Sequence, residues 1–117
     1  MGENAVEIKS KAFALRIVKL YQCLCANNEF VLSKQVLRSG TSIGANVKES
    51  IHAQSRADFY AKLYVSYKEA NETEYWLEIL HESGYIDDEC FKSIYADCKE
   101  LIRLLAAITK TQKTISN

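Results

Sequence analysis

The sequence predicts an all-α protein, an antiparallel up-down-up-down bundle of four helices. Its 117 residues include no proline and four glycines, whereas an all-β domain needs such turn residues about every ten positions. Apolar side chains instead recur at intervals of three and four residues, which is the period of a helix with one buried face. The length fits a single domain over residues 1–117.

Two helices are expected in the first half of the chain. The first spans residues 6–26 and ends at the polar stretch 27–29, where the apolar period stops. The second spans residues 33–54. We expect Ser33 to be its N-cap, because a serine hydroxyl accepts a hydrogen bond from a free backbone amide of the first turn.

Two further helices are expected in the second half. The third spans residues 56–83, where Ser55 and Asp58 match a capping box and Gly84 suits the left-handed residue that ends a helix. The fourth spans residues 87–112 and begins with acidic residues, which favour the positive end of the helix dipole. Because the connections are short, consecutive helices are expected to be antiparallel neighbours.

The second predicted helix contains two glycines, Gly40 and Gly44. Inside a helix each costs about 0.5–1 kcal/mol relative to alanine. Their spacing of four places them on one face, where the missing side chains allow another helix to approach closely. We therefore expect both glycines at a helix–helix contact.

The short turn near residues 55–56 also sets the register between the second and third helices. It places Glu49 opposite Lys62, and Arg38 near Glu74 with Glu72 close by. Such residues form either exposed ion pairs, each contributing at most about 1 kcal/mol, or a partly buried network that fixes helix register or a subunit contact. The full set expected to pack helices or subunits together is Arg38, Gly40, Gly44, Glu49, Lys62, Glu69, Glu72 and Trp76.

Three tyrosines, Tyr60, Tyr64 and Tyr67, form a second aromatic stripe on the third helix. It lies beside the stripe of Phe59 and Leu63, so this helix has two apolar faces to bury. Tyrosine is frequent at interfaces because its ring can be buried while its hydroxyl stays hydrogen bonded. The stripe is therefore expected either inside the subunit or at an oligomer interface, the latter as a closed ring or dimer.

Charge is unevenly distributed although 15 basic and 15 acidic residues cancel. Residues 1–68 hold ten basic and five acidic residues, residues 69–100 hold two and ten, and residues 101–117 hold three and none. A local basic patch able to hold phosphates is one interpretation; a mixed solvated surface or charge complementarity between subunits is the other. The patch would consist of Lys9, Lys11, Arg16, Lys19, Lys110 and Lys113.

No enzymatic or cofactor site is predicted. Two Glu-x-x-His matches, at residues 49–52 and 78–81, resemble half-sites of di-iron bundles, but consecutive antiparallel helices place them about 25 Å apart. The four cysteines do not have zinc spacing, and no catalytic Ser/His or Cys/His spacing occurs. No stretch approaches the length of a membrane span. We therefore expect a protein that binds no metal, cofactor, membrane or small-molecule substrate. We expect it to be cytoplasmic.

A family resemblance rests on one long motif and several short ones. The long motif, at residues 38–49, reads Arg-Ser-Gly-Thr-Ser-Ile-Gly-Ala-Asn-Val-Lys-Glu. The short ones are Ser55, Asp58, Phe59, Lys62, Leu63 and residues 68–70 and 72–77. The sequence resembles the bacterial four-helix bundle proteins encoded in ribosomal RNA intervening sequences, also labelled a ribosomal protein family. The resemblance covers nearly the whole chain and implies a homopentameric barrel of unknown molecular activity. A related branch of that family, the accessory variability determinant proteins of diversity-generating retroelements, acts with a reverse transcriptase and binds nucleic acid, so the resemblance implies these as alternative partners.

The predicted function is accordingly a non-enzymatic, self-associating four-helix bundle that forms a pentameric ring. The alternative is a nucleic-acid-binding accessory factor that acts with RNA or a reverse transcriptase through the basic patch. A net charge of zero gives no long-range attraction for polyanions, so the alternative depends on that local patch.

Overall fold

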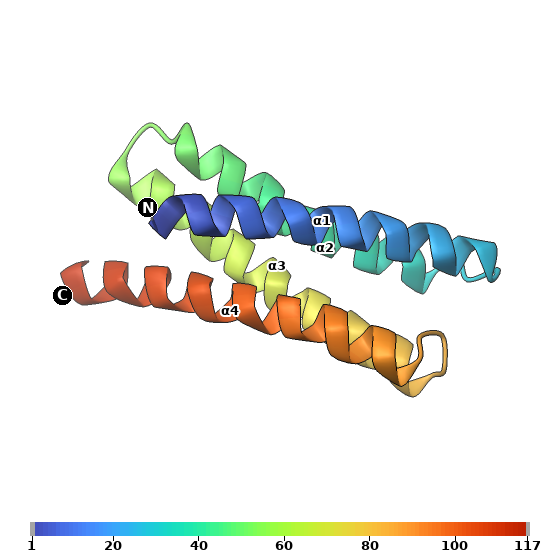
Figure 1. The fold of residues 1–117 in the computed structure, drawn as a ribbon. Coiled ribbons are helices and arrows are strands. Elements are labelled where there is room, and N and C mark those ends of the chain that lie inside the picture. Colours follow the sequence, from blue (N-terminus) through green and yellow to red (C-terminus); the bar gives the residue numbers. More distant parts are fainter. Residues whose placement is uncertain (1, 117) are drawn as a thin grey trace.

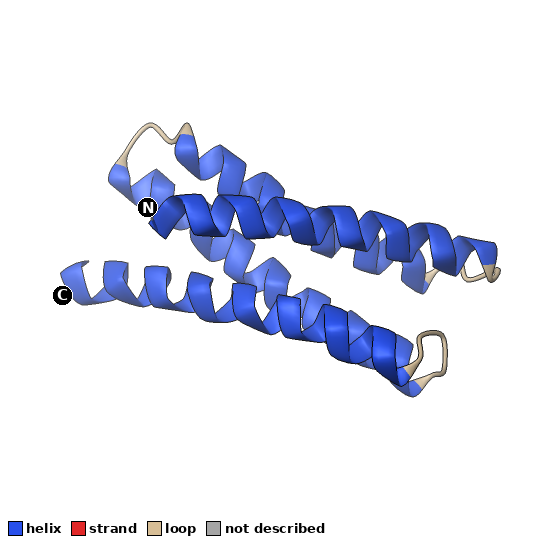
Figure 2. Cartoon of the chain, viewed as in Figure 1, coloured by secondary structure: helices blue, strands red, loops and turns tan. Residues whose placement is uncertain are grey.

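The computed structural model describes the backbone of residues 2–116 and the side chains of residues 5–110. It contains helices α1 (Gly2–Ala26), α2 (Leu32–Ile51), α3 (Arg56–Glu82) and α4 (Asp88–Ser116). Each helix runs antiparallel to the next (Figure 1). Figure 2 shows that loops are confined to the two ends of the bundle. The predicted all-α up-down fold is therefore confirmed.

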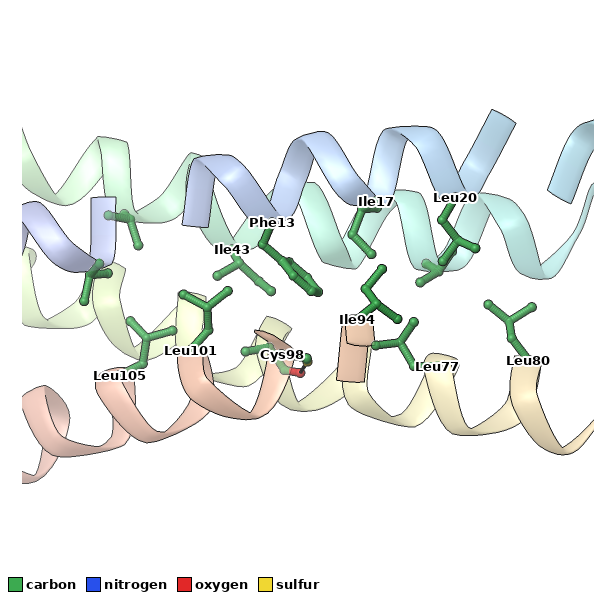
Figure 3. Close-up of a cluster of buried hydrophobic side chains, with 14 of the residues drawn as sticks. Phe13, Ile17, Leu20, Ile43, Leu77, Leu80, Ile94, Cys98, Leu101 and Leu105 are labelled. Atoms are coloured by element: carbon green, nitrogen blue, oxygen red, sulfur yellow. Dashed lines mark hydrogen bonds between the residues drawn. The ribbon is translucent and has the colours of Figure 1, made fainter. Parts of the chain in front are cut away.

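The helices enclose one apolar core. α1 packs against α2 and α4, and α3 packs against the same two helices from the other side. Figure 3 shows side chains from all four helices meeting along the bundle axis. Burying a large apolar side chain of this kind contributes about 1.5–3 kcal/mol. The largest fully buried apolar side chains include Phe13, Ile17, Leu24, Ile43, Leu77, Leu80, Leu101 and Leu105.

Helix boundaries in the second half follow the local sequence signals. The Ser55 hydroxyl accepts a hydrogen bond from the Asp58 amide at 3.0 Å, and the Asp58 carboxylate accepts one from the Gln54 amide at 3.3 Å. Gly84 follows α3 with a φ of 88°, a conformation that is accessible to glycine at little steric cost. The Asp87 carboxylate accepts from the Cys90 amide at 2.8 Å and caps α4. These capping predictions are confirmed.

The start of α2 differs from the prediction. The carboxylate of Glu29, not the hydroxyl of Ser33, caps this helix: it accepts hydrogen bonds from the amides of Val31 at 2.6 Å, Leu32 at 3.0 Å and Ser33 at 2.8 Å. Asn28, with a φ of 65°, turns the chain so that Glu29 can reach forward. A carboxylate with two oxygens satisfies more amides than a hydroxyl and also favours the positive helix end. Ser33 lies inside the first turn instead.

Three other boundaries shift by three residues or more. α1 begins at Gly2 rather than at residue 6, and α2 ends at Ile51 rather than at residue 54. α4 continues to Ser116 rather than ending at residue 112. Residues 109–116 contain no glycine, asparagine or proline, the residue types that commonly end a helix.

α1 crosses α2 closely at the two glycines. A Cβ atom at Gly40 would lie 2.7 Å from Cγ1 and 2.9 Å from Cγ2 of Ile17, and one at Gly44 would lie 3.2 Å from the carbonyl oxygen of Ser10. The neighbour that approaches both glycines is thus α1. The glycine face is therefore used for a helix–helix contact within the subunit.

Candidate interaction surfaces

A surface groove of about 670 Å³ lies between α3 and α4. Tyr60, Tyr64 and Tyr67 line it from α3, with Ala57 and Ala61 beside them and Ala106 from α4. The three rings lie here because their positions are offset by one residue from the buried stripe of α3, which brings them to the edge of its seam with α4. The predicted tyrosine stripe is therefore neither fully inside the subunit nor fully on a flat surface.

The tyrosine groove is aromatic and edged by cations. Tyr64 is 51% exposed, whereas Tyr67 is partly buried against the core. The Tyr64 and Tyr67 ring centroids are 5.9 Å apart. The guanidinium of Arg56 lies 5.8 Å from the centre of the Tyr60 ring, and the ammonium of Lys68 lies 5.7 Å from that of Tyr64. These separations suit cation–π interactions.

An exposed apolar stripe runs along α1, and sequence reasoning missed it. Ile8 is 68% exposed, Leu15 61% and Val18 37%. Their spacing of seven and three residues gives one helix face, distinct from the buried face that contains Phe13 and Ile17. The sequence signal was present in this spacing, but the stronger Phe13 and Ile17 period concealed it. We call this set the α1 stripe.

The seam between α2 and α3 carries a partly buried ion-pair network. The two terminal guanidinium nitrogens of Arg38 donate to Glu69, Nη1 at 3.0 Å and Nη2 at 3.2 Å, and Nη2 also donates to Glu72 at 2.6 Å. The Trp76 indole donates to the same Glu72 oxygen at 2.9 Å. The predicted Glu49–Lys62 pair is present at 3.0 Å. The predicted closeness of Arg38 to Glu72 is confirmed. Its predicted closeness to Glu74 is wrong, since helical spacing turns Glu74 toward α4, where it pairs with Lys99.

Because Arg38 pairs with Glu72, its contribution to the free energy of unfolding depends on pH. Hydrogen bonds from Trp76 and Arg38 lower the pKa of Glu72 below its ordinary value. A lowered pKa in the folded state stabilises the protein above the unfolded pKa of about 4.3, and that stabilisation is lost as pH falls through the folded value.

We expect Arg38→Met to lower the free energy of unfolding by up to about 1 kcal/mol at pH 7, because the network is partly exposed. The difference from wild type should close as the pH falls below about 4. Urea unfolding at a series of pH values measures it. Lys48→Met is the matched control, since Lys48 is largely exposed and lies 3.9 Å from Glu7. A difference that is constant down to acid pH would contradict the role assigned to Glu72.

A second polar cluster joins α3 to α4. The Tyr95 hydroxyl lies 2.7 Å from the Glu78 carboxylate and 3.0 Å from that of Glu74, and the Lys99 ammonium donates to Glu74 at 2.8 Å. Hydrogen bonding to Glu78, burial and hydrogen bonding to Glu74 raise the pKa of Tyr95 well above its ordinary value. No local sequence pattern predicts this cluster, because its members face each other only once α4 packs on α3.

We expect Tyr95→Phe to lower the free energy of unfolding by about 1–3 kcal/mol, because two partly buried carboxylates would share the single cation Lys99. Thermal unfolding monitored at pH 7 measures the loss. Tyr75→Phe, at a ring of α3 that is 54% exposed, serves as the control.

The predicted basic patch is divided by ion pairs. Lys9 donates to Glu100 at 2.9 Å, and Arg16 donates to Asp97 at 2.7 Å. Lys11 and Lys19 are exposed on α1, whereas Lys110 lines the tyrosine groove. Lys113 lies outside the residues whose side chains are described. Among the residues whose side chains are described, Lys9 and Arg16 thus lie beside acidic partners, and Lys110 lies between α3 and α4 rather than on α1.

Side chains that bind metals do not cluster in the described part of the chain, where no group of three or more His, Cys, Asp or Glu is placed to hold a metal ion. His81 stacks on Phe91 with ring centroids 4.1 Å apart and contacts the Asp88 carboxylate at 2.7 Å. Cys98 is buried and its thiol donates to the Ala70 carbonyl at 3.4 Å, and burial raises its pKa to about 12.

Within the described residues, no helix is long and apolar enough to span a membrane.

The fold and these surfaces define a class of protein, an antiparallel four-helix bundle with an aromatic groove and a separate apolar stripe on its exterior. The chain belongs to the 23S rRNA-intervening sequence protein family, which matches residues 3–107. It is 56% identical to a protein of unknown function from the S23 ribosomal protein family of Bacteroides thetaiotaomicron. That crystal structure aligns with a TM-score of 0.92 over 94% of this chain and 99% of the other. None of the curated proteins matches. The resemblance seen in the sequence is thereby confirmed.

Proposed function

We propose that this protein is a non-enzymatic, self-associating bundle whose copies assemble into a closed ring, with the five subunits that the family resemblance implies. The observation that carries the proposal is the presence of two different apolar surfaces on one subunit, the tyrosine groove and the α1 stripe. α1 packs on α2 and α4, whereas the groove lies between α3 and α4, so the two surfaces face different directions. Contacts between unlike surfaces are the kind that generate rings.

The two surfaces are similar in length. The α1 stripe extends from Ile8 to Val18, and the α3 wall of the groove extends from Ala57 to Tyr67. Each spans ten residues of helix, or about 15 Å. The stripe of one subunit is therefore long enough to match the groove of its neighbour.

The two surfaces also overlap in height along the bundle. Glu7 contacts Lys48 at 3.9 Å, and the adjacent Glu49 contacts Lys62 at 3.0 Å. Ile8 consequently lies near the level of Lys62, which falls within the α3 wall of the groove. A closed ring requires such overlap, because its rotation carries no shift along the axis.

Light scattering coupled to size exclusion tests the proposal. Wild type is expected at a multiple of the 13.3 kDa subunit mass, whereas Tyr64→Lys and Leu15→Lys should each be monomeric, because each places a charge in one of the two surfaces. Both side chains are more than half exposed, so folding should be retained, as circular dichroism would verify. Tyr75→Lys, at an exposed residue of α3 outside the groove, is the control and should assemble normally.

Mixing the two monomeric variants distinguishes a ring contact from a symmetric dimer contact. Tyr64→Lys retains the stripe and Leu15→Lys retains the groove, so the mixture should form a heterodimer with one intact contact. A wild-type protein that remains monomeric at high concentration would overturn the proposal. Variants that assemble like wild type would refute this interface, and a mixture that stays monomeric would refute the pairing of groove with stripe.

A second candidate function is binding of single-stranded nucleic acid in the same groove. It is favoured by the positions of Arg56 and Lys68 over the tyrosine rings, since bases stack on aromatic side chains while cations contact phosphates. Binding of a labelled single-stranded RNA, followed by fluorescence anisotropy at several salt concentrations, tests it. The double variant Arg56→Ala/Lys68→Ala should weaken RNA binding while leaving assembly intact. Absence of binding at low salt would eliminate this function.

A further inference from the structure

The seam between α1 and α4 closes the bundle, because these are its first and last helices (Figure 1). Two side chains of α1 reach across it: Lys9 bonds to Glu100 at 2.9 Å, and Arg16 bonds to Asp97 at 2.7 Å and to Ser93 at 3.0 Å. These contacts fix the antiparallel register of the two helices.

The same register places two cysteines opposite each other. Cys23 follows Arg16 by seven residues on α1, and Cys90 precedes Asp97 by seven residues on α4. Seven residues are about two helical turns, so Cys23 and Cys90 occupy the same faces as the ion pair, two turns nearer the end of the bundle. Both thiols are free and both residues are exposed.

The electrostatic surroundings of Cys90 agree with this placement. Partial burial raises the pKa of its thiol, Asp87 and Cys23 raise it further, and Arg16 opposes them. Cys23 and Arg16 are thus both within electrostatic reach of Cys90. The other two cysteines face elsewhere: Cys98 is buried against α3, and Cys25 lies two positions from Cys23, about 200° around α1.

We propose that Cys23 and Cys90 form a dithiol site that is oxidised to a disulfide joining α1 to α4 by exchange with a low-molecular-weight disulfide. The Cys23 thiolate attacks one sulfur of that disulfide and expels the other as a thiolate. The Cys90 thiolate then attacks the Cys23 sulfur and expels the second small thiolate. The two cysteine protons end on the two released thiols, so the protein loses two electrons and the small disulfide gains them.

Oxidation should strengthen the bundle. Residues 23 and 90 are 67 positions apart (90 − 23), and a cross-link over so long a loop restricts the unfolded chain strongly. We expect the melting temperature to rise by roughly 10 °C on oxidation and to return on reduction.

The experiment incubates the purified protein with oxidised glutathione and then blocks remaining thiols with an alkylating reagent. Peptide mapping should find Cys23 linked to Cys90 with the loss of two hydrogen atoms, and thermal unfolding should show the reversible rise. Cys23→Ser and Cys90→Ser should each abolish both effects. Cys25→Ser is the matched control, since it removes a neighbouring thiol of the same helix, and it should retain them.

Three results would overturn the site. One is retention of four alkylated cysteines after oxidation; another is a glutathione adduct on Cys23 that persists without closing onto Cys90; the third is a disulfide between subunits or between Cys23 and Cys25. The readout does not depend on assembly, because the monomeric variant Tyr64→Lys should close the same disulfide.

Discussion

Replacing Gly40 with valine is expected to lower the free energy of unfolding by about 3 kcal/mol or more, as a severe case of overpacking. A Cβ atom at this position would lie 2.7 and 2.9 Å from the two γ carbons of Ile17. Those carbons are attached to a branched Cβ with one preferred rotamer in a helix, so Ile17 cannot rotate away. Urea unfolding followed by circular dichroism measures the loss.

A double-mutant cycle tests whether Ile17 is the cause. Ile17→Ala alone should cost about 2–5 kcal/mol by leaving a cavity. Adding Gly40→Ala to that variant should be neutral or stabilising, because the clash is gone and alanine favours a helix by about 1 kcal/mol over glycine. In wild type, Gly40→Ala should instead destabilise. Gly44→Ala is the milder comparison, since its nearest neighbour is the Ser10 carbonyl oxygen at 3.2 Å. Additive effects of the two substitutions would contradict the contact.

Removal of the Glu29 carboxylate is expected to produce the second large loss. Glu29→Ala would leave three amides at the start of α2 without their acceptor, among them the buried amide of Ser33. Hydrogen bonds to a charged group contribute about 1.5–3 kcal/mol each but are not additive here, so we expect a loss of about 2–4 kcal/mol. Unfolding in urea provides the measurement.

Two variants distinguish the effect of the negative charge of Glu29 from the effect of its side-chain length. Glu29→Gln retains one acceptor oxygen and should recover part of the loss, while Glu29→Asp shortens the side chain and should recover little. Glu82→Ala, at an exposed acid near the same end of the bundle, should change stability by less than about 0.5 kcal/mol. Equal losses of stability for Glu29→Gln and Glu29→Ala would contradict this expectation, because they would mean that a neutral acceptor oxygen recovers none of the loss.

Local signals in the sequence were sufficient for the helices and for one seam. Ser55, Asp58 and Gly84 act within four residues of the helix ends that they set. The short turn between α2 and α3 was enough to predict the Glu49–Lys62 pair. The family was also recognisable from the run at residues 38–49. Such features depend on neighbours in the chain, which the sequence displays directly.

Features that depend on packing between distant segments were missed or misplaced. Glu29 was read as part of a helix stop, because its role as a cap depends on the turn at Asn28 that aims it forward. Arg38 meets Glu72 as predicted, but the predicted closeness of Glu74 is wrong, since the side of α3 that faces α2 is settled by the packing of the whole core. The α1 stripe likewise becomes recognisable only when the buried face of α1 is known.

The arrangement of the seams also bears on how the chain folds. Three of the four helix pairs in contact are consecutive in sequence, and only α1 with α4 joins distant segments. Contacts between near neighbours form quickly, whereas closing a long loop is entropically slow. We therefore expect rapid folding through helical hairpins, with docking of α1 on α4 as the last event. By the same reasoning this seam is the first to open, and amides beside it should exchange with solvent at a lower free energy than those of the α2–α3 hairpin.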